Sequence, residues 1–204
     1  MTKVVVITGG IGSGKSEVCR IFADNGFAAQ YNADSRAKAL YVEYPSLLEA
    51  MQNRLGCSLK DDKGNFQPAL LSARIFSDKA ALETVESLLF PVMMDDFASF
   101  AERSGSEYVV FESATVLEKP QFDGFADKVI LVDAPLETRL ERACARDGAS
   151  REAVLARMRA QTLMNELSQG GSDPRVDYVI MNDSTLDVLR ERTMKTIELL
   201  TENI

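Results

Sequence analysis

The chain has 204 residues, 46% of them hydrophobic and 26% charged, which suits one globular domain with insertions. Its net charge of −8 argues against a nucleic-acid partner, and no run of ~18 apolar residues is present to predict a membrane span. The absence of histidine excludes histidine-dependent triads, and three scattered cysteines disfavour a disulfide framework or a zinc site. No signal-peptide pattern precedes the first apolar run, so we expect a cytoplasmic protein.

Five short apolar runs predict the strands of one sheet. Runs that are apolar throughout are typical of parallel strands buried on both faces. The runs are Val4–Thr8, Phe27–Tyr31, Tyr108–Phe111, Val129–Val132 and Tyr178–Met181. Segments with helical spacing lie between them, and a further one over 186–200 follows the last run. We therefore expect an α/β fold, in which a five-stranded parallel sheet is flanked by helices.

Two intervals between these runs are too long for a single crossover helix. The first, 35–105, has the pattern of several helices, and the second, 136–175, holds helical stretches and a polar loop. We predict that 35–105 is a helical substrate-binding region and that 136–175 is a lid. The sheet-bearing core then comprises 1–34, 106–135 and 176–204.

The first predicted strand leads directly into a glycine-rich motif of the pattern G-x-x-x-x-G-K-[ST]. Glycines let the backbone approach phosphates closely, and successive N–H groups at a helix start form an anion-binding nest. Lysine can reach the β- and γ-phosphates, and the final hydroxyl can ligate Mg²⁺. We therefore predict that ATP contacts Gly10, Ile11, Gly12, Ser13, Gly14, Lys15 and Ser16. Lys15 is also predicted to act in catalysis, and Ser16 is the predicted metal ligand.

Two carboxylates follow predicted strands, where the partners of a phosphate loop are expected to gather. Asp34 comes after the second run and can accept the proton of an attacking hydroxyl; the alternative is a helix N-cap. Glu112 ends the third run and can contact substrate or the waters of a metal; the alternative is an ordinary polar strand end. With no histidine available, Asp34 is the first candidate for the catalytic base.

The second long interval is rich in arginine, whose planar fork suits phosphate. Arg142 and Arg146 share one helix face, as do Arg157 and Gln161. We assign Arg142 and Arg146 to ATP, with Arg142 also catalytic, and Arg157 and Gln161 to the substrate. The alternative is a solvated face paired with neighbouring acidic residues. Asn182, after the last run, is predicted to contact the nucleotide, unless it is a simple turn residue.

Several motifs together make the chain similar to the dephospho-coenzyme A kinases along essentially its whole length. The matching segments are Val6–Ser16, Ala33-Asp34, Glu112–Ala114 with Leu117-Glu118, Arg139–Gln161 and Asp177–Asn182. The resemblance implies a P-loop kinase core and transfer of the ATP γ-phosphate to the ribose 3′-hydroxyl of dephospho-CoA. It also implies Mg²⁺, Asp34 as the catalytic base, a CoA-binding helical region and a lid. We expect a monomer or a weak homo-oligomer.

The chain departs from the family pattern at four positions. Asn32 stands where the family has an aspartate, Phe90 where it has histidine, Met94 where it has arginine and Ala114 where it has proline. Two alternatives therefore stay open. One is another P-loop small-molecule kinase, of the nucleoside monophosphate, shikimate or gluconate type. The other is a catalytically weakened protein that binds CoA or a nucleotide.

Overall fold

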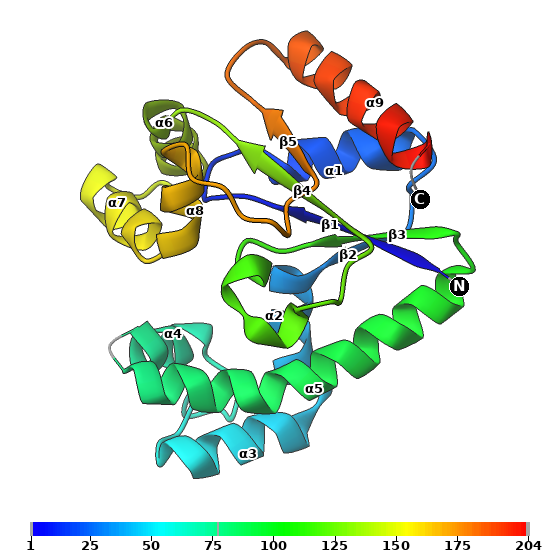
Figure 1. Ribbon diagram of the computed structural model, residues 1–204. Helices are drawn as coiled ribbons and strands as arrows, with labels where there is room; N and C mark the ends of the chain where they lie inside the picture. The colour runs from blue at the N-terminus through cyan, green and yellow to red at the C-terminus, as the bar shows by residue number, and fades with distance from the viewer. Residues whose placement is uncertain (1, 77, 203–204) are drawn as a thin grey trace. The chain divides into compact units, whose positions relative to one another are not determined.

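Figure 1 shows the computed structural model of the chain, which describes residues 2–76 and 78–202. The strands in this described part are β1 (Lys3–Thr8), β2 (Gln30–Asn32), β3 (Tyr108–Glu112), β4 (Lys128–Asp133) and β5 (Tyr178–Met181). The helices are α1 (Lys15–Asp24), α2 (Ala33–Glu43), α3 (Pro45–Leu55), α4 (Pro68–Phe76), α5 (Lys79–Ser104), α6 (Leu136–Asp147), α7 (Arg151–Arg159), α8 (Thr162–Ser168) and α9 (Leu186–Glu202). Two 3₁₀ turns, η1 (Val116–Glu118) and η2 (Pro120–Phe122), lie between β3 and β4.

The five strands form one parallel sheet in the order β2-β3-β1-β4-β5, which confirms the predicted fold class. In the register, Ile7 of β1 is level with Glu112 of β3, which is level with Asn32 of β2. The carboxyl ends of these three strands therefore meet at one edge of the sheet. In open parallel sheets, ligands bind at this edge, where the strand order reverses.

The core explains why these segments are strands. Val5, Val6 and Ile7 of β1 have no exposed surface. Helices α1 and α9 pack against each other on one face, shown at the top of Figure 1. Their apolar residues join one face of the strands in a single cluster, and strand residues of the opposite face, such as Val6 and Phe111, are also fully buried, as the continuous apolar runs of the sequence require.

The predicted second strand was placed slightly too early. Phe27 lies outside β2, because its N–H donates to the carbonyl of Phe22 at the end of α1 and its ring packs edge-on against that residue. The pairing with β3 begins only at Gln30, level with Val110. The apolar character of this segment thus comes from closing the end of α1 as well as from the sheet.

The chain divides into two compact units, one made of 1–32 and 104–204 and the other of 33–103. The second unit has its own core, with Leu40, Met51 and Leu59 almost completely buried. In the same unit, Arg36 of α2 pairs with Asp96 of α5 at 2.9 Å. Whether 35–105 binds substrate and 136–175 acts as a lid stays a prediction.

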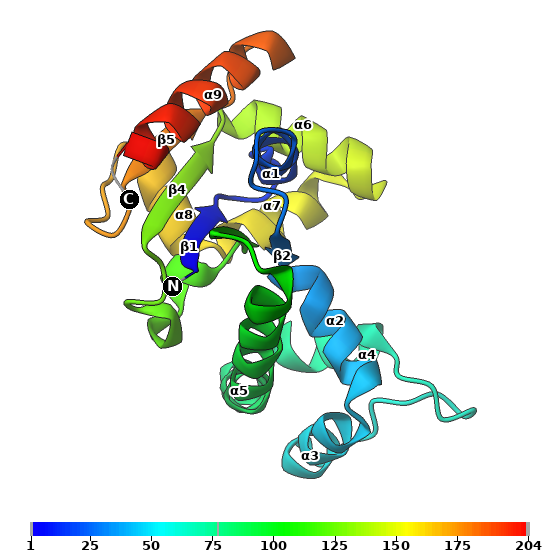
Figure 2. The same cartoon turned by 90° about the vertical axis from the view of Figure 1, so that its right-hand side faces the viewer.

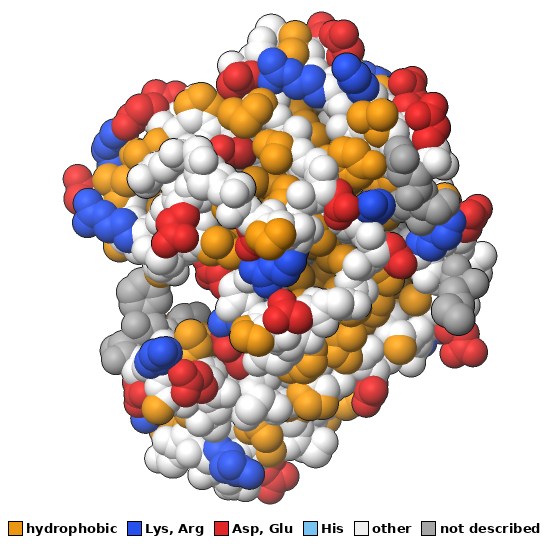
Figure 3. Space-filling model, viewed as in Figure 1, with side chains coloured by type: hydrophobic (Ala, Val, Ile, Leu, Met, Phe, Trp, Pro, Cys, Tyr) orange, Lys and Arg blue, Asp and Glu red, His pale blue; other side chains and the backbone are white. Residues whose placement is uncertain are grey.

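The surface in Figure 3 carries charges of both signs over α9, at the top of the view, where basic and acidic side chains alternate. Within residues 2–76 and 78–202, none of the helices is both long enough and apolar enough to cross a bilayer.

Candidate active site

The loop between β1 and α1 has the conformation that its glycines predict. Gly12 has φ +77°, in the left-handed region that favours glycine. A Cβ on Gly12 would lie 2.1 Å from the backbone carbonyl oxygen of Arg139. Gly14, with φ +97°, is the N-cap of α1, so the positive end of the helix dipole lies at this loop. The loop is therefore a backbone cradle at a helix N-terminus, the arrangement that binds phosphate.

The polar side chains of the motif lie against the loop and the neighbouring strand end. Lys15 Nζ donates to the Gly9 carbonyl at 2.8 Å and to the Gly10 carbonyl at 3.4 Å. Ser16 Oγ donates to Glu112 Oε1 at 2.8 Å, and Asn32 Nδ2 donates to Glu112 Oε2 at 2.7 Å. Glu112 thus joins the start of α1 to the end of β2. The structure brings Lys15, Ser16 and Glu112 together at the carboxyl edge of the sheet.

The oxygen donors of Ser16 and Glu112 fit Mg²⁺ delivered with a nucleotide. Mg²⁺ in such sites keeps several waters and takes few protein ligands, since phosphates supply others. In the described part of the chain, no group of three or more histidine, cysteine, aspartate or glutamate residues could form a cage for a metal. One hydroxyl beside one carboxylate, next to a phosphate cradle, is a small set of oxygen donors of the kind that phosphate-bound Mg²⁺ takes.

On its buried side, the loop is held by two side chains from distant parts of the sequence. The Ile11 N–H donates to Gln161 Oε1 at 2.8 Å, and Arg139 Nε donates to the Ile11 carbonyl at 3.1 Å. Arg139 and Gln161 are only 1% and 6% exposed. Arg139 is carried by α6, which is drawn at the upper right of Figure 2. The structure therefore places Gln161, predicted to bind substrate, on the phosphate loop itself.

A second contact to the loop comes from the segment after β5. Asn182 Nδ2 donates to the Ser13 carbonyl at 2.8 Å, and the Asn182 side chain is buried. Arg142 donates from Nη1 to the Asn182 carbonyl and from Nη2 to its side-chain oxygen, both at 3.3 Å. Arg142 and Asn182 thus lie beside the loop, where a nucleotide's phosphates are expected.

Arg146 and Arg157 instead share the carboxylate of Asp147. Arg146 Nε lies 2.7 Å from Asp147 Oδ1, and Arg157 Nη2 lies 2.7 Å from Oδ2. These two guanidinium groups hold the pKa of the Asp147 carboxyl well below its usual range. The assignments of Arg146 to ATP and of Arg157 to substrate stay predictions.

Asp34 is the second residue of α2 and follows β2 after one residue, Ala33. It is exposed and lies in the first turn of the helix, in the 33–103 unit. A carboxylate there also suits the helix dipole, so helix position alone does not distinguish a catalytic role from a capping one. Its role as catalytic base stays a prediction.

Sequence reasoning missed the residues that support Arg139. Arg139 Nη1 donates to Ser168 Oγ at 2.8 Å, and Ser168 in turn donates to Asp133 Oδ1 at 2.8 Å. Burial lowers the pKa of the Arg139 guanidinium, and the carboxylate of Asp133, 3.6 Å from Nη1, opposes that shift. Arg139 was one of six arginines in a helical stretch, and only its place on the buried face of α6 separates it from the others.

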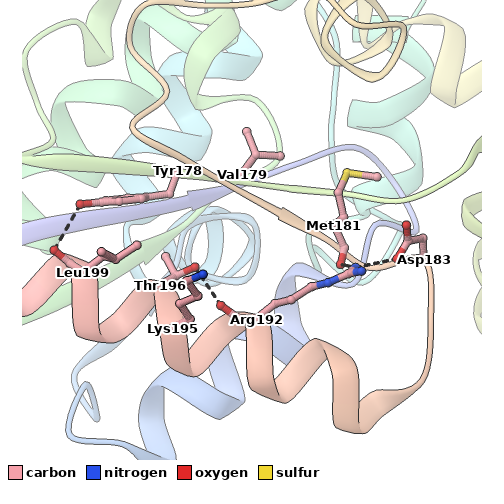
Figure 4. Close-up of a pocket in the computed structure, with 8 residues that line it drawn as sticks. All are labelled: Tyr178, Val179, Met181, Asp183, Arg192, Lys195, Thr196 and Leu199. Carbon is pink, nitrogen blue, oxygen red and sulfur yellow. Dashed lines mark hydrogen bonds and ion pairs between the residues drawn. The ribbon is translucent and has the colours of Figure 1, made fainter.

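The described residues of the 1–32 and 104–204 unit border hollows in at least two places. One, of about 320 Å³, is bordered by Asp133, Arg139, Asn165 and Ser168, beside the buried side of the phosphate loop. Another, of about 420 Å³, lies between β5 and α9. Figure 4 shows Arg192 in this second hollow, where it reaches the Met181 carbonyl and Asp183 at 2.5 and 2.6 Å. Arg192 and Asp183 pair with each other there, and we assign no ligand to this hollow.

Comparison with known proteins identifies the family of this chain. The family model described as dephospho-CoA kinase matches residues 3–187. The chain belongs to the dephospho-CoA kinase family. A dephospho-CoA kinase from Porphyromonas gingivalis is 39% identical over 170 residues, or 83% of either chain. One from Idiomarina loihiensis is 33% identical over 192 residues, or 94% of this chain and 92% of that relative.

Solved structures agree with this fold. The Thermus thermophilus protein TT1252 has a TM-score of 0.82 and 30% identity, covering 100% of this chain and 98% of that one. A dephospho-CoA kinase from Campylobacter jejuni has a TM-score of 0.63 and 22% identity, covering 99% and 98%. A shikimate kinase from Acinetobacter baumannii has a TM-score of 0.55 and 15% identity, covering 100% of this chain and 95% of that one. At the identities of these last two structures, the similarity shows the fold alone.

Proposed function

We propose that this member of the dephospho-CoA kinase family transfers the γ-phosphate of ATP to the ribose 3′-hydroxyl of dephospho-CoA, giving CoA and ADP. The observation that carries the proposal is the phosphate loop with Lys15 and the Ser16–Glu112 pair at the carboxyl edge of the sheet. Membership of the dephospho-CoA kinase family indicates that dephospho-CoA is the phosphate acceptor. A cytoplasmic location and a monomeric or weakly associated state remain predictions.

Phosphoryl transfer needs positioning and charge stabilisation more than covalent chemistry. In the proposed mechanism the backbone N–H groups of the loop bind the phosphates, and Lys15, which here donates to two loop carbonyls, turns to the β- and γ-phosphates. Arg142 adds a second cation beside the loop. These groups stabilise the charge that shifts to the β-phosphate oxygen as the bond to the γ-phosphorus breaks.

The acceptor hydroxyl must lose a proton as its oxygen bonds to the γ-phosphorus. In the proposed mechanism Asp34 accepts this proton, since the chain has no histidine for the task. Ser16 would hold Mg²⁺, with Glu112 beside it to bind the ion's waters. When bound, the ion would neutralise charge on the phosphates.

The proposal is tested by replacing Asp34 with asparagine and measuring steady-state kinetics and ATP binding. The expected result is a fall in kcat of about 100-fold or more, with the Kd for ATP within about threefold of the unaltered chain, as for loss of a general base. Asp187→Asn is the matched control, because Asp187 is also exposed in the first turn of a helix, α9. It removes a helix-dipole contact without touching the proposed site.

Near-normal turnover of Asp34→Asn would contradict the role of Asp34. A panel of acceptors tests the rest of the proposal: dephospho-CoA against shikimate, gluconate and nucleoside monophosphates, each with ATP. Turnover with one of the other acceptors, and none with dephospho-CoA, would make the chain a different small-molecule kinase. ATP and dephospho-CoA binding without any turnover would favour the catalytically weakened alternative.

A further inference from the structure

The phosphate loop is held from behind by a buried arginine. Arg139 is 1% exposed, and it donates from Nε to the Ile11 carbonyl and from Nη1 to Ser168 Oγ. Its Nη2 has no hydrogen-bond partner within residues 2–76 and 78–202, and a Cβ on Gly10 would lie only 2.4 Å from that atom. The guanidinium is therefore packed directly against the loop backbone.

The hydrogen bond from Arg139 to the Ile11 carbonyl sets the orientation of the peptide between Ile11 and Gly12. In a trans peptide the C=O and the following N–H point in opposite directions. Because the Ile11 carbonyl points back to Arg139, the N–H of Gly12 points away from the buried side. Asn182 has the same effect two residues later, because its hydrogen bond to the Ser13 carbonyl directs the Gly14 N–H away from Asn182.

The peptide before Ile11 obeys the same rule in reverse. Gln161 accepts a hydrogen bond from the Ile11 N–H on the buried side of the loop, so the Gly10 carbonyl, which belongs to the same peptide, points away from Gln161. That carbonyl lies 3.4 Å from Lys15 Nζ and accepts a hydrogen bond from the Ser13 N–H at 3.1 Å. Ile11 is thus held at both its N–H and its C=O, and the loop cannot flip either peptide without breaking a buried hydrogen bond.

Burying a guanidinium is unfavourable unless its donors are satisfied and its charge is paired. Here Ser168 and Asp133 supply part of that compensation, with Ser168 Oγ bridging the two charged groups at 2.8 Å on each side. The bridge holds the guanidinium in one place. A fixed positive charge behind the loop also favours a phosphate anion in front of it.

We propose that Arg139, held by Ser168 and Asp133, is a positioning residue that sets the phosphate loop in its ATP-binding conformation before the nucleotide arrives. Arg139 acts through the backbone of Ile11 and does not touch substrate. The proposal rests on the proposed function in taking ATP as the nucleotide. Its effect is expected on nucleotide affinity, because a pre-set loop binds without first having to be ordered.

The test compares Arg139→Met, Arg139→Lys and Ser168→Ala with the unaltered chain, using calorimetric ATP binding without acceptor and steady-state kinetics. Arg139→Met should raise the Kd and KM for ATP by about tenfold or more, as expected for loss of a charged hydrogen bond. The kcat at saturating ATP and the KM for dephospho-CoA should change by less than about threefold. Arg139→Lys, which can still donate to Ile11, should restore part of the affinity, and Ser168→Ala should weaken ATP binding less than Arg139→Met.

Arg190→Met is the matched control, because it makes the same exchange on the exposed face of α9. The proposal would be overturned if Arg139→Met bound ATP with wild-type affinity. It would also be overturned if kcat and thermal stability fell while both KM values rose to a similar extent. If Arg139→Met does not fold, Arg139→Lys and Ser168→Ala decide by the same split between affinity and turnover. An unaltered chain that binds ATP but does not phosphorylate dephospho-CoA would refute the proposed function, and the calorimetric comparison of ATP affinities and the thermal stabilities would then decide this proposal.

Discussion

Gly12→Ala tests whether the phosphate loop is as closely packed against α6 as the structure indicates. The added Cβ would lie 2.1 Å from the Arg139 carbonyl oxygen and 2.7 Å from its carbon. Both are backbone atoms of α6, which cannot rotate away as a side chain can. Either the loop or the helix has to move, and in each case the contact between Arg139 and Ile11 is stretched.

The matched control is Gly124→Ala. Gly124 has φ +73°, close to the +77° of Gly12, lies in the same unit, and has open space where its Cβ would be. A left-handed alanine costs about 1–2 kcal/mol at either position. Gly12→Ala adds the cost of forcing atoms into a filled space, about 1–3 kcal/mol. We therefore expect Gly12→Ala to lose roughly 2–5 kcal/mol and Gly124→Ala roughly 1–2 kcal/mol.

Thermal denaturation followed by circular dichroism measures the loss of stability, and titration calorimetry measures the change in ATP affinity. For a chain of this length each kcal/mol lowers Tm by roughly 2–4 °C. Gly12→Ala should also weaken ATP binding by at least about tenfold, which corresponds to ~1.4 kcal/mol, while Gly124→Ala leaves it unchanged. Equal stability losses in the two variants, together with normal ATP affinity in Gly12→Ala, would refute this account of the loop.

Three further predictions follow from side chains near the site and in the second unit. Asn182→Ala removes the donor to the Ser13 carbonyl and should raise the Kd for ATP about five- to tenfold in calorimetry; unchanged affinity would contradict its role. Asp147→Asn releases Arg146 and Arg157 from a shared carboxylate, so KM for ATP should fall about two- to threefold; a rise would mean that Asp147 orders these arginines for binding. Burial raises the pKa of Tyr41 to about 12 from 10.0, so ultraviolet titration should show a phenolate step near pH 12, and Tyr41→Phe should remove that step. Because the native state keeps this proton where the unfolded chain has lost it, stability should fall by up to roughly 3 kcal/mol as pH rises from 10 to 12.

The sheet and the phosphate loop could be predicted from the sequence because their signals are local. Five apolar runs each lie within a single strand, and the glycine motif, strand and helix are contiguous. The start of β2 was misplaced because an apolar residue such as Phe27 serves equally well to close a helix or to enter a sheet. Hydrophobic periodicity indicates that a residue is buried, but it does not indicate which neighbouring element buries it.

The supports of the loop could not be predicted, because their partners are far away in the sequence. Gln161 and Ile11 are separated by 150 residues, and Asn182 and Ser13 by 169. Six arginines between 139 and 159 have similar chemistry, yet Arg139 is buried behind the loop, Arg142 lies beside it and Arg146 pairs with Asp147. Which face of α6 meets the loop depends on tertiary packing.

The departure at Asn32 can be understood from the charges around Glu112. Sheet register sets residue 32 level with Glu112, and the Asn32 amide donates to one carboxylate oxygen while Ser16 donates to the other. An aspartate at this position would put two carboxylates in contact, which is unfavourable unless a proton or a cation lies between them. Asparagine replaces that repulsion with a hydrogen bond, so each carboxylate oxygen of Glu112 accepts one hydrogen bond, from Asn32 or from Ser16. The exchange therefore removes one carboxylate from the edge of the sheet and leaves Ser16, Glu112 and the phosphates of the nucleotide as the oxygen donors available to a cation.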